Sequence, residues 1–120
     1  MKINATEFND LFVLEYDSFL DNRGEFVKTI HKDIFSKNKL EFQFHESFFS
    51  ISQKEVFRGM HFQVPPDDHV KLVYVVKGSI IDVVIDLRNQ SPTFGQYFTI
   101  ELSEVNRKGI YIGKGFAHGF

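Results

Sequence analysis

Residues 72–87 read LVYVVKGSIIDVVIDL, and this stretch decides the fold class. Val and Ile dominate both arms, and β-branched residues favour strands. The pair Lys77-Gly78 separates the arms, and glycine can supply the positive φ that a tight turn requires. The pattern predicts a β-hairpin with strands over 72–76 and 80–87.

Short runs of alternating apolar and polar residues recur along the rest of the chain, broken by turn residues about every 8–12 positions. Further strands are expected over 11–14, 25–30, 42–48, 56–63, 97–102 and 110–112, with a turn at 21–24. The only helix predicted covers 33–39, with Asp33 as its N-cap. This organisation indicates a single all-β domain over residues 1–120, a sandwich or a barrel.

The overall composition excludes several classes of protein. The chain has 120 residues, is 42% hydrophobic and 25% charged, and has a formal net charge of −2, which is typical of one globular domain. The absence of a basic patch argues against a nucleic-acid partner. No apolar run reaches the ~18 residues of a transmembrane helix, and the N-terminus lacks a signal-peptide core, so we expect no membrane partner and a cytoplasmic location. Without cysteine there is no disulfide, thiolate metal site or cysteine nucleophile.

Phenylalanine is unusually frequent, with 15 Phe and no Trp. A domain of this size buries only about two thirds of its unfolded surface, so some of these rings are expected to line a pocket or a subunit contact. The chain ends on Ala117-His118-Gly119-Phe120, directly after a turn and on an apolar ring. Domains usually finish in a polar tail or a complete element, so we expect that closing strands of the sheet are absent.

The stretch from Phe57 to Gln63 concentrates polar chemistry on one predicted strand. Arg58 can grip a phosphate through two hydrogen bonds. His61 and Gln63 share one face of a strand, whereas Arg58 points to the other face unless Gly59 bulges the chain. The alternative interpretation is a surface arginine and a hydrogen-bonded core histidine.

Three further charged residues allow two interpretations each. Lys71 is either a surface residue whose stem lies along the strand or a cation aimed into the barrel mouth to stabilise an oxyanion. Asp82 and Asp86 share a face of their strand. They form either a carboxylate pair or the polar outward positions of a sheet.

A metal site is the other chemistry that the histidines could support. Jelly-roll metalloproteins of the cupin type carry a His-x-His pair and a later histidine after a glycine-containing turn, which resembles His61 and His118. Here the pair is His61-x-Gln63, and the nearby Asp67 and Asp68 lie in a Pro-rich loop. Two histidines without a secure carboxylate make a poor site for zinc or iron, so no metal and no other cofactor is predicted. Phosphate-loop and serine-nucleophile motifs are absent as well.

Taken together, six stretches resemble one family, the dTDP-4-dehydrorhamnose 3,5-epimerases and their nucleotide-sugar epimerase relatives, which are metal-free, cupin-like jelly rolls. In chain order the stretches are Asp21-x-Arg23-Gly24-x-Phe26, Arg58-Gly59-Met60-His61-Phe62-Gln63, Lys71-Leu72-Val73, Asp82-Val83-Val84-Ile85-Asp86-Leu87-Arg88, Ser91-Pro92-Thr93-Phe94-Gly95 and Gly115-Phe116-Ala117-His118-Gly119-Phe120. The resemblance implies a cupin-like jelly roll over residues 1–120, the N-terminal portion of an epimerase-like domain.

The resemblance also implies a reaction. The substrate would be a nucleotide-linked 4-keto-6-deoxy sugar of a surface-polysaccharide pathway, deprotonated at C3 and C5 through an enolate. His61 would be the base and Lys71 would stabilise the enolate oxygen. Substrate contacts would come from Arg23, Phe26, Arg58, Gln63 and His118. In relatives the segment of Arg23 enters a neighbouring subunit, which implies a homodimer with exchange of N-terminal strands.

Departures from the family pattern keep alternatives open. The family's general-acid tyrosine and the aspartate that orients its base would fall beyond Phe120, so that within this chain Tyr74, Tyr97 or Tyr111 would have to supply the acid. The chain has His45-Glu46-Ser47 in place of Gln-x-Asn, and Lys28 in place of an acidic residue. The alternatives are a nucleotide-sugar 3,4-ketoisomerase and a non-catalytic or truncated sugar-nucleotide-binding domain. The 120-residue form is expected to bind better than it turns over.

Overall fold

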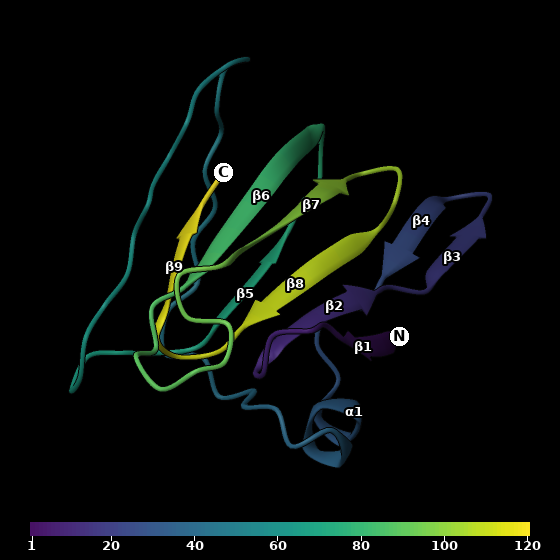
Figure 1. Cartoon of the computed structure of the whole chain (residues 1–120). Coiled ribbons are helices and arrows are strands. Elements are labelled where there is room, and N and C mark those ends of the chain that lie inside the picture. The colour runs from purple at the N-terminus through teal and green to yellow at the C-terminus, as the bar shows by residue number, and fades with distance from the viewer.

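The computed structural model describes residues 1–120 and confirms the all-β class, with nine strands and one short helix (Figure 1). The elements are β1 (Lys2–Ala5), β2 (Leu11–Glu15), β3 (Ser18–Asp21), β4 (Gly24–Val27), α1 (Lys32–Lys37), β5 (Lys71–Tyr74), β6 (Ser79–Asp86), β7 (Tyr97–Ser103), β8 (Lys108–Ile112) and β9 (Phe116–Gly119). No helix is long and apolar enough to span a membrane.

The strands form two main antiparallel sheets and a separate hairpin. One sheet has the order β1-β2-β8-β5, the other has the order β7-β6-β9, and β3 pairs only with β4. A cluster of seven buried apolar residues joins the two main sheets: Phe8, Leu11, Val84, Leu102, Ile110, Ile112 and Phe116. Because its members come from strands of both sheets, the main core lies between them, as in a sandwich.

Alternation along the strands decides which side chains enter this core. In β8, Ile110 and Ile112 belong to the cluster between the sheets, whereas Tyr111 belongs to a second cluster on the outer face. In β6, Asp82, Val84 and Asp86 are buried together. Successive side chains of a strand point to opposite faces, so both aspartates of β6 lie on its inner face, and the interpretation of them as outward polar positions is wrong.

The helix covers the outer face of the four-stranded sheet. Phe35 of α1 is fully buried in the second cluster, with Leu14, Tyr16, Leu40 and Tyr111. The predicted helix is confirmed, but it begins at Lys32, one residue before the predicted cap. His31 occupies the N-cap without a side-chain hydrogen bond, and Asp33 lies in the first turn.

The strands predicted within 72–87 are confirmed as β5 and β6, but the hairpin between them is wrong. β5 pairs with β8, while β6 pairs with β7 and β9 in the opposite sheet. Gly78 does have a positive φ of 81°, yet the connection carries the chain from one sheet to the other. Each strand then presents its apolar face to the same core from opposite sides.

The strand predicted over 42–48 does not form, and of the strand predicted over 56–63 only the pairing of Arg58 and His61 with the end of the chain is present. Residues 42–57 make no backbone–backbone hydrogen bond, and a strand needs a paired neighbour. Phe42 and Phe44 pack on the outer cluster, but Phe48 and Phe49 are 84% and 87% exposed. Figure 1 shows this part of the chain, in teal, extending away from the sheets beside β9.

Elsewhere the predicted strands are confirmed with small shifts of their ends. The turn at 21–24 joins β3 to β4, which ends at Val27 rather than at residue 30. β1, β3 and β9 were not predicted. The last of these occupies the segment that follows the expected turn and was expected to be the chain end, and it pairs with β6.

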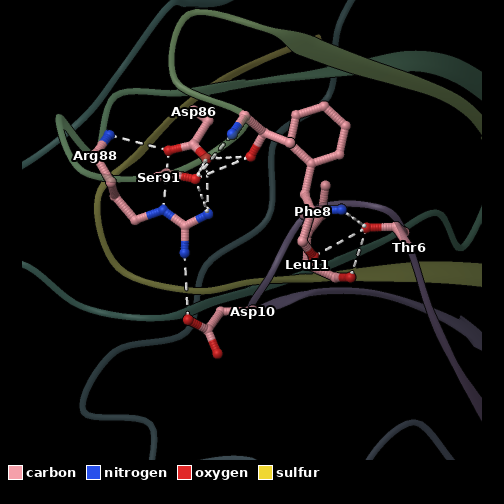
Figure 2. A network of polar contacts seen from close by, with 8 residues as sticks. Thr6, Phe8, Asp10, Leu11, Asp86, Arg88 and Ser91 are labelled. Atoms are coloured by element: carbon pink, nitrogen blue, oxygen red, sulfur yellow. Dashed lines mark hydrogen bonds and ion pairs between the residues drawn. The ribbon is translucent and has the colours of Figure 1, made fainter.

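A buried ionic network holds the loop that follows β6 (Figure 2). The Asp86 carboxylate accepts hydrogen bonds from Arg88 Nη2 at 2.7 Å, Ser91 Oγ at 2.6 Å and Thr93 Oγ1 at 2.6 Å. Arg88 Nη1 also donates to Asp10 at 3.2 Å, which ties the loop to the β1–β2 connection. Burial raises the pKa of the Asp86 carboxyl, but the hydrogen bonds from its neighbours outweigh burial and hold the pKa well below its usual range.

Candidate active site

The segment that contains His61 runs antiparallel to β9. The His61 N–H donates to the His118 carbonyl at 2.8 Å, and the His118 N–H donates to the His61 carbonyl at 2.9 Å. Residues that exchange both hydrogen bonds lie directly opposite each other, with their side chains on the same face. The two imidazoles therefore project from the same side of this pair.

A β-bulge lies immediately before His61. Arg58 and Phe120 exchange a second pair of backbone hydrogen bonds, of 2.7 and 3.0 Å. Arg58 and His61 are three positions apart in the sequence, whereas their partners Phe120 and His118 are only two positions apart. The extra residue places Gly59 and Met60 opposite Gly119 alone, which is a bulge. The bulge brings Arg58 to the same nominal side as His61, which simple alternation would not do.

Two glycines make this close approach possible. Gly59 has a φ of 142°, and a Cβ added to it would lie 2.6 Å from the Gly119 Cα. A Cβ on Gly119 would lie 3.0 Å from the Arg58 carbonyl oxygen. A side chain at either position would push the His61 segment away from β9.

A buried carboxylate meets His118 on the inner face of the three-stranded sheet. Asp82 Oδ2 lies 2.8 Å from His118 Nε2. Asp82 has no exposed surface, and His118 is 6% exposed. The second oxygen of the carboxylate, Oδ1, has no hydrogen-bond partner. Asp82 and His118 thus form a dyad that is shielded from water on nearly every side.

Lys71 reaches the same interior from the opposite sheet. It lies opposite Ile112 in the β5–β8 register, and Ile112 is part of the core between the sheets, so Lys71 starts on the inner face. Burial lowers the pKa of the Lys71 amine, and the Asp82 carboxylate acts against that by raising it. The geometry therefore favours a half-buried cation near Asp82 over a fully solvated surface lysine.

The remaining residues predicted for the site lie elsewhere. Arg23 and Phe26 are on the exposed β3–β4 hairpin, which Figure 1 shows at the side of the molecule remote from β9. Arg23 pairs there with Asp21 at 2.6 Å. Gln63 lines an open cavity of about 340 Å³ that also contains Arg88 and Lys114.

Arg58 is held by the extended segment that precedes it. Its Nε donates to Ser52 Oγ at 2.9 Å, and its Nη2 donates to the Ile51 carbonyl at 3.3 Å. The His61 ring is exposed and makes no side-chain hydrogen bond. The structure thus brings together His61, Lys71 and His118, and leaves the arginines at the periphery.

None of the tyrosines joins this interior group. Tyr16 and Tyr111 lie in the outer cluster, Tyr74 packs edge-to-face against Tyr16 with ring centroids 5.9 Å apart, and Tyr97 is 69% exposed. No three His, Asp or Glu side chains gather in a way that could hold a metal ion. The interior group instead gains Asp82, which was not selected from the sequence as a site residue. The sequence did contain a sign that Asp82 would be buried: it lies two residues before Val84 in a strand of apolar residues, so the two side chains share a face.

Comparison with known proteins identifies the family of the chain. Residues 5–120 match the family model for dTDP-4-dehydrorhamnose 3,5-epimerase. The protein of that name from Methanothermobacter thermautotrophicus is 40% identical over 115 residues, which are 96% of this chain and 62% of that protein. The protein from Shigella flexneri is 38% identical, over all of this chain and 67% of its own length. The chain thus spans about two thirds of the curated relatives that it matches.

Solved structures of the same kind share the fold. A Bacillus anthracis dTDP-4-dehydrorhamnose 3,5-epimerase with TDP and PPi bound superposes with a TM-score of 0.93 at 38% identity, covering 99% of this chain and 69% of the other. A Legionella pneumophila epimerase in complex with dTDP-4-keto-L-rhamnose gives 0.92 at 38% identity, covering 99% and 63%. The cupin-like jelly roll expected from the sequence is thereby confirmed. On the family match over nearly the whole chain, this protein belongs to the dTDP-4-dehydrorhamnose 3,5-epimerase family.

Proposed function

We propose that this protein is an isomerase that epimerises a dTDP-linked 4-keto-6-deoxy sugar at C3 and C5, on the route to dTDP-rhamnose and surface polysaccharide. One observation carries the proposal. His118 contacts the buried Asp82, His61 is paired with His118 through two backbone hydrogen bonds, and Lys71 starts on the inner face of the opposite sheet, in a chain of the epimerase family. The Legionella pneumophila relative was solved with dTDP-4-keto-L-rhamnose, a sugar nucleotide of this class, and the Bacillus anthracis relative with TDP and PPi.

His61 is the proposed base. The protons at C3 and C5 are acidified by the ketone at C4, so that their removal gives an enolate. Imidazole changes its charge near neutral pH, which suits a general base. The His61 ring is exposed and free of side-chain partners, so it is available to a substrate that enters between the sheets.

Lys71 is the proposed electrostatic partner of the enolate. Negative charge develops on the C4 oxygen only as the proton leaves, so a fixed cation lowers the barrier more than it strengthens ground-state binding. The half-buried setting of Lys71 strengthens this interaction because less water screens it.

The other proposed contacts serve binding. Arg58 would hold the pyrophosphate, while Gln63 and His118 would contact the sugar. Arg23 and Phe26 would reach the site of a second copy, in a homodimer with exchanged N-terminal strands. The apolar surface of the β3–β4 hairpin supports that arrangement, since Phe26 is 61% exposed and Phe19 is 62% exposed.

A second candidate function, a sugar-nucleotide-binding domain without turnover, is favoured by the placement of the tyrosines. Epimerisation requires an acid that returns a proton to the other face of the sugar, and a positioned general acid contributes about 10²–10⁴-fold. Tyr74, Tyr97 and Tyr111 all lie outside the interior group. A 3,4-ketoisomerase, which uses the same enolate, has no comparable observation in its favour.

The test separates binding, deprotonation and inversion. The chain is mixed with dTDP-4-keto-6-deoxyglucose in D₂O, and proton NMR follows the loss of H3 and H5 and the growth of epimer signals. Calorimetry with dTDP measures binding alone. We expect exchange at both carbons that His61→Asn abolishes while dTDP affinity is retained.

Each outcome decides between the candidates. Exchange that survives His61→Asn refutes the assignment of the base. Binding of dTDP without any exchange selects the binding domain. A chain that neither binds nor exchanges overturns the proposed function as a whole.

A further inference from the structure

The carboxylate of Asp82 is the least compensated buried charge in the site. It has no exposed surface, and only Oδ2 has a partner, the Nε2 of His118 at 2.8 Å. Oδ1 is unpaired and equally inaccessible. A buried carboxylate is costly unless positive charge and hydrogen bonds surround it. Asp86, four residues along the same face, shows the contrast, because Arg88, Ser91 and Thr93 fully satisfy it.

Four titratable groups lie on the elements that surround this site, one on each element. They are Lys71 of β5, Asp82 of β6, His118 of β9 and His61 of the segment paired with β9. Lys71 is the only amine among them. Its amine responds to Asp82, since the carboxylate opposes the effect of burial on the Lys71 pKa. Asp82 therefore contacts His118 directly and acts on Lys71 electrostatically.

The same carboxylate also constrains the ring of His118. An ionised carboxylate can only accept, so the nitrogen beside it carries the proton. The hydrogen bond of one ring nitrogen decides the state of the other. With Nε2–H directed at Asp82, the neutral His118 ring is left with Nδ1 as an acceptor, and the ring plane is fixed by the 2.8 Å contact.

We infer that Asp82 is a positioning residue that fixes His118 as the Nε2–H tautomer and keeps Lys71 positively charged at neutral pH. The first effect orients an acceptor toward a sugar hydroxyl, and the second keeps the cation available to an oxyanion. The consequence for turnover rests on the proposed function. The two effects on Lys71 and His118 do not depend on the proposed function, and they can be measured on the protein without substrate.

The experiment compares the wild-type chain with Asp82→Asn, which keeps the size of the side chain and removes its charge. Long-range proton–nitrogen NMR reports the tautomer of His118. The pH dependence of amine acylation, read by mass spectrometry, reports the protonation of Lys71. We expect a single Nε2–H tautomer in the wild type and a mixture in the variant. We also expect Lys71 of the variant to be acylated several-fold faster at pH 7, because the carboxylate that raises the pKa of the Lys71 amine is no longer there.

Two further variants serve as controls. Asp82→Glu restores the charge and should bring the reactivity of Lys71 back toward that of the wild type. Glu101→Gln removes an exposed carboxylate from β7, the strand next to β6, and should change neither readout. Circular dichroism establishes that each variant is folded.

The inference is overturned if folded Asp82→Asn leaves both readouts unchanged, or if Glu101→Gln shifts them equally. Should Asp82→Asn fail to fold, the wild type decides alone: a Nδ1–H tautomer of His118, or a Lys71 that is mostly neutral at pH 7, refutes it. Absence of deuterium exchange in the wild type would refute the proposed function without touching these results.

Discussion

Replacement of Gly59 by alanine tests whether the close approach to β9 builds the site. The new Cβ would lie 2.6 Å from the Gly119 Cα and 3.1 Å from the His118 carbonyl oxygen, at a φ of 142°. Backbone groups on both sides leave no flexible side-chain end that could yield. An L-residue held in such a conformation costs about 1–3 kcal/mol, and relief of the contact requires the two segments to separate.

Separating the His61 segment from β9 also costs free energy, because it breaks backbone hydrogen bonds. The four backbone hydrogen bonds that Arg58 and His61 share with Phe120 and His118 contribute about 1 kcal/mol each. Breaking the pairing between these two segments therefore costs about as much free energy as keeping alanine in the strained conformation. The core between the sheets is not affected by either. We expect Gly59→Ala to weaken this pairing by about 1–3 kcal/mol, which corresponds to about 5–150-fold less protection of the four amides from hydrogen exchange.

Hydrogen exchange followed by NMR measures this directly, with Gly24→Ala as the matched control. Gly24 has a similar φ of 126°, but a Cβ there would meet nothing within 4 Å. The control therefore carries the strain of φ without the collision. Unchanged protection of the Arg58, His61, His118 and Phe120 amides in Gly59→Ala would refute the reasoning, as would an equal loss in Gly24→Ala.

Three other predictions address the metal, the ionic network and the assembly. Metal analysis should find far less than one ion per chain, and a chelator should leave deuterium exchange unchanged; a stoichiometric metal whose removal stops exchange contradicts this. The pKa of Asp86 in the folded state lies below its unfolded value of about 3.9. The contribution of this carboxylate to the free energy of unfolding is therefore complete above about pH 4 and is lost as the pH falls further. Asp86→Asn should therefore lower urea stability by about 2–3 kcal/mol at pH 7 and by much less at pH 2, and an equal loss at both would exclude this origin. Light scattering should report twice the mass of one chain, and the double change Phe19→Ser and Phe26→Ser should return the monomer; a wild-type monomer would refute the strand exchange.

The strands were predictable from local pattern, but their partners were not. Alternation located β5 and β6 within a few residues, because burial of one face is a local property of the sequence. The choice between a hairpin and a crossing of the core depends on β8 and β9, about thirty residues further along. The pattern over 42–48 shows the converse, because alternation without a partner strand leaves an extended segment.

The site was predictable as a set of residues and not as an arrangement. His61, Lys71 and His118 stand out by their chemistry in apolar surroundings. Their convergence depends on the bulge at Gly59 and on the pairing of two distant segments, which no local pattern encodes. From the sequence, Asp82 and Asp86 are two equivalent carboxylates on one face of a strand. Only the position of β9 in the fold shows that Asp82 contacts His118, whereas Asp86 contacts Thr93.

The pairing of Asp82 with His118 also has a consequence for the order of events during synthesis. The two residues are 36 positions apart, so β6 leaves the ribosome well before the partner of its buried carboxylate exists. Until β9 arrives, closing the two sheets would strip water from an uncompensated charge. We expect the nascent chain to keep the inner face of β6 hydrated until His118 has docked, so that the contact that orders the candidate site also sets the moment at which these two sheets close.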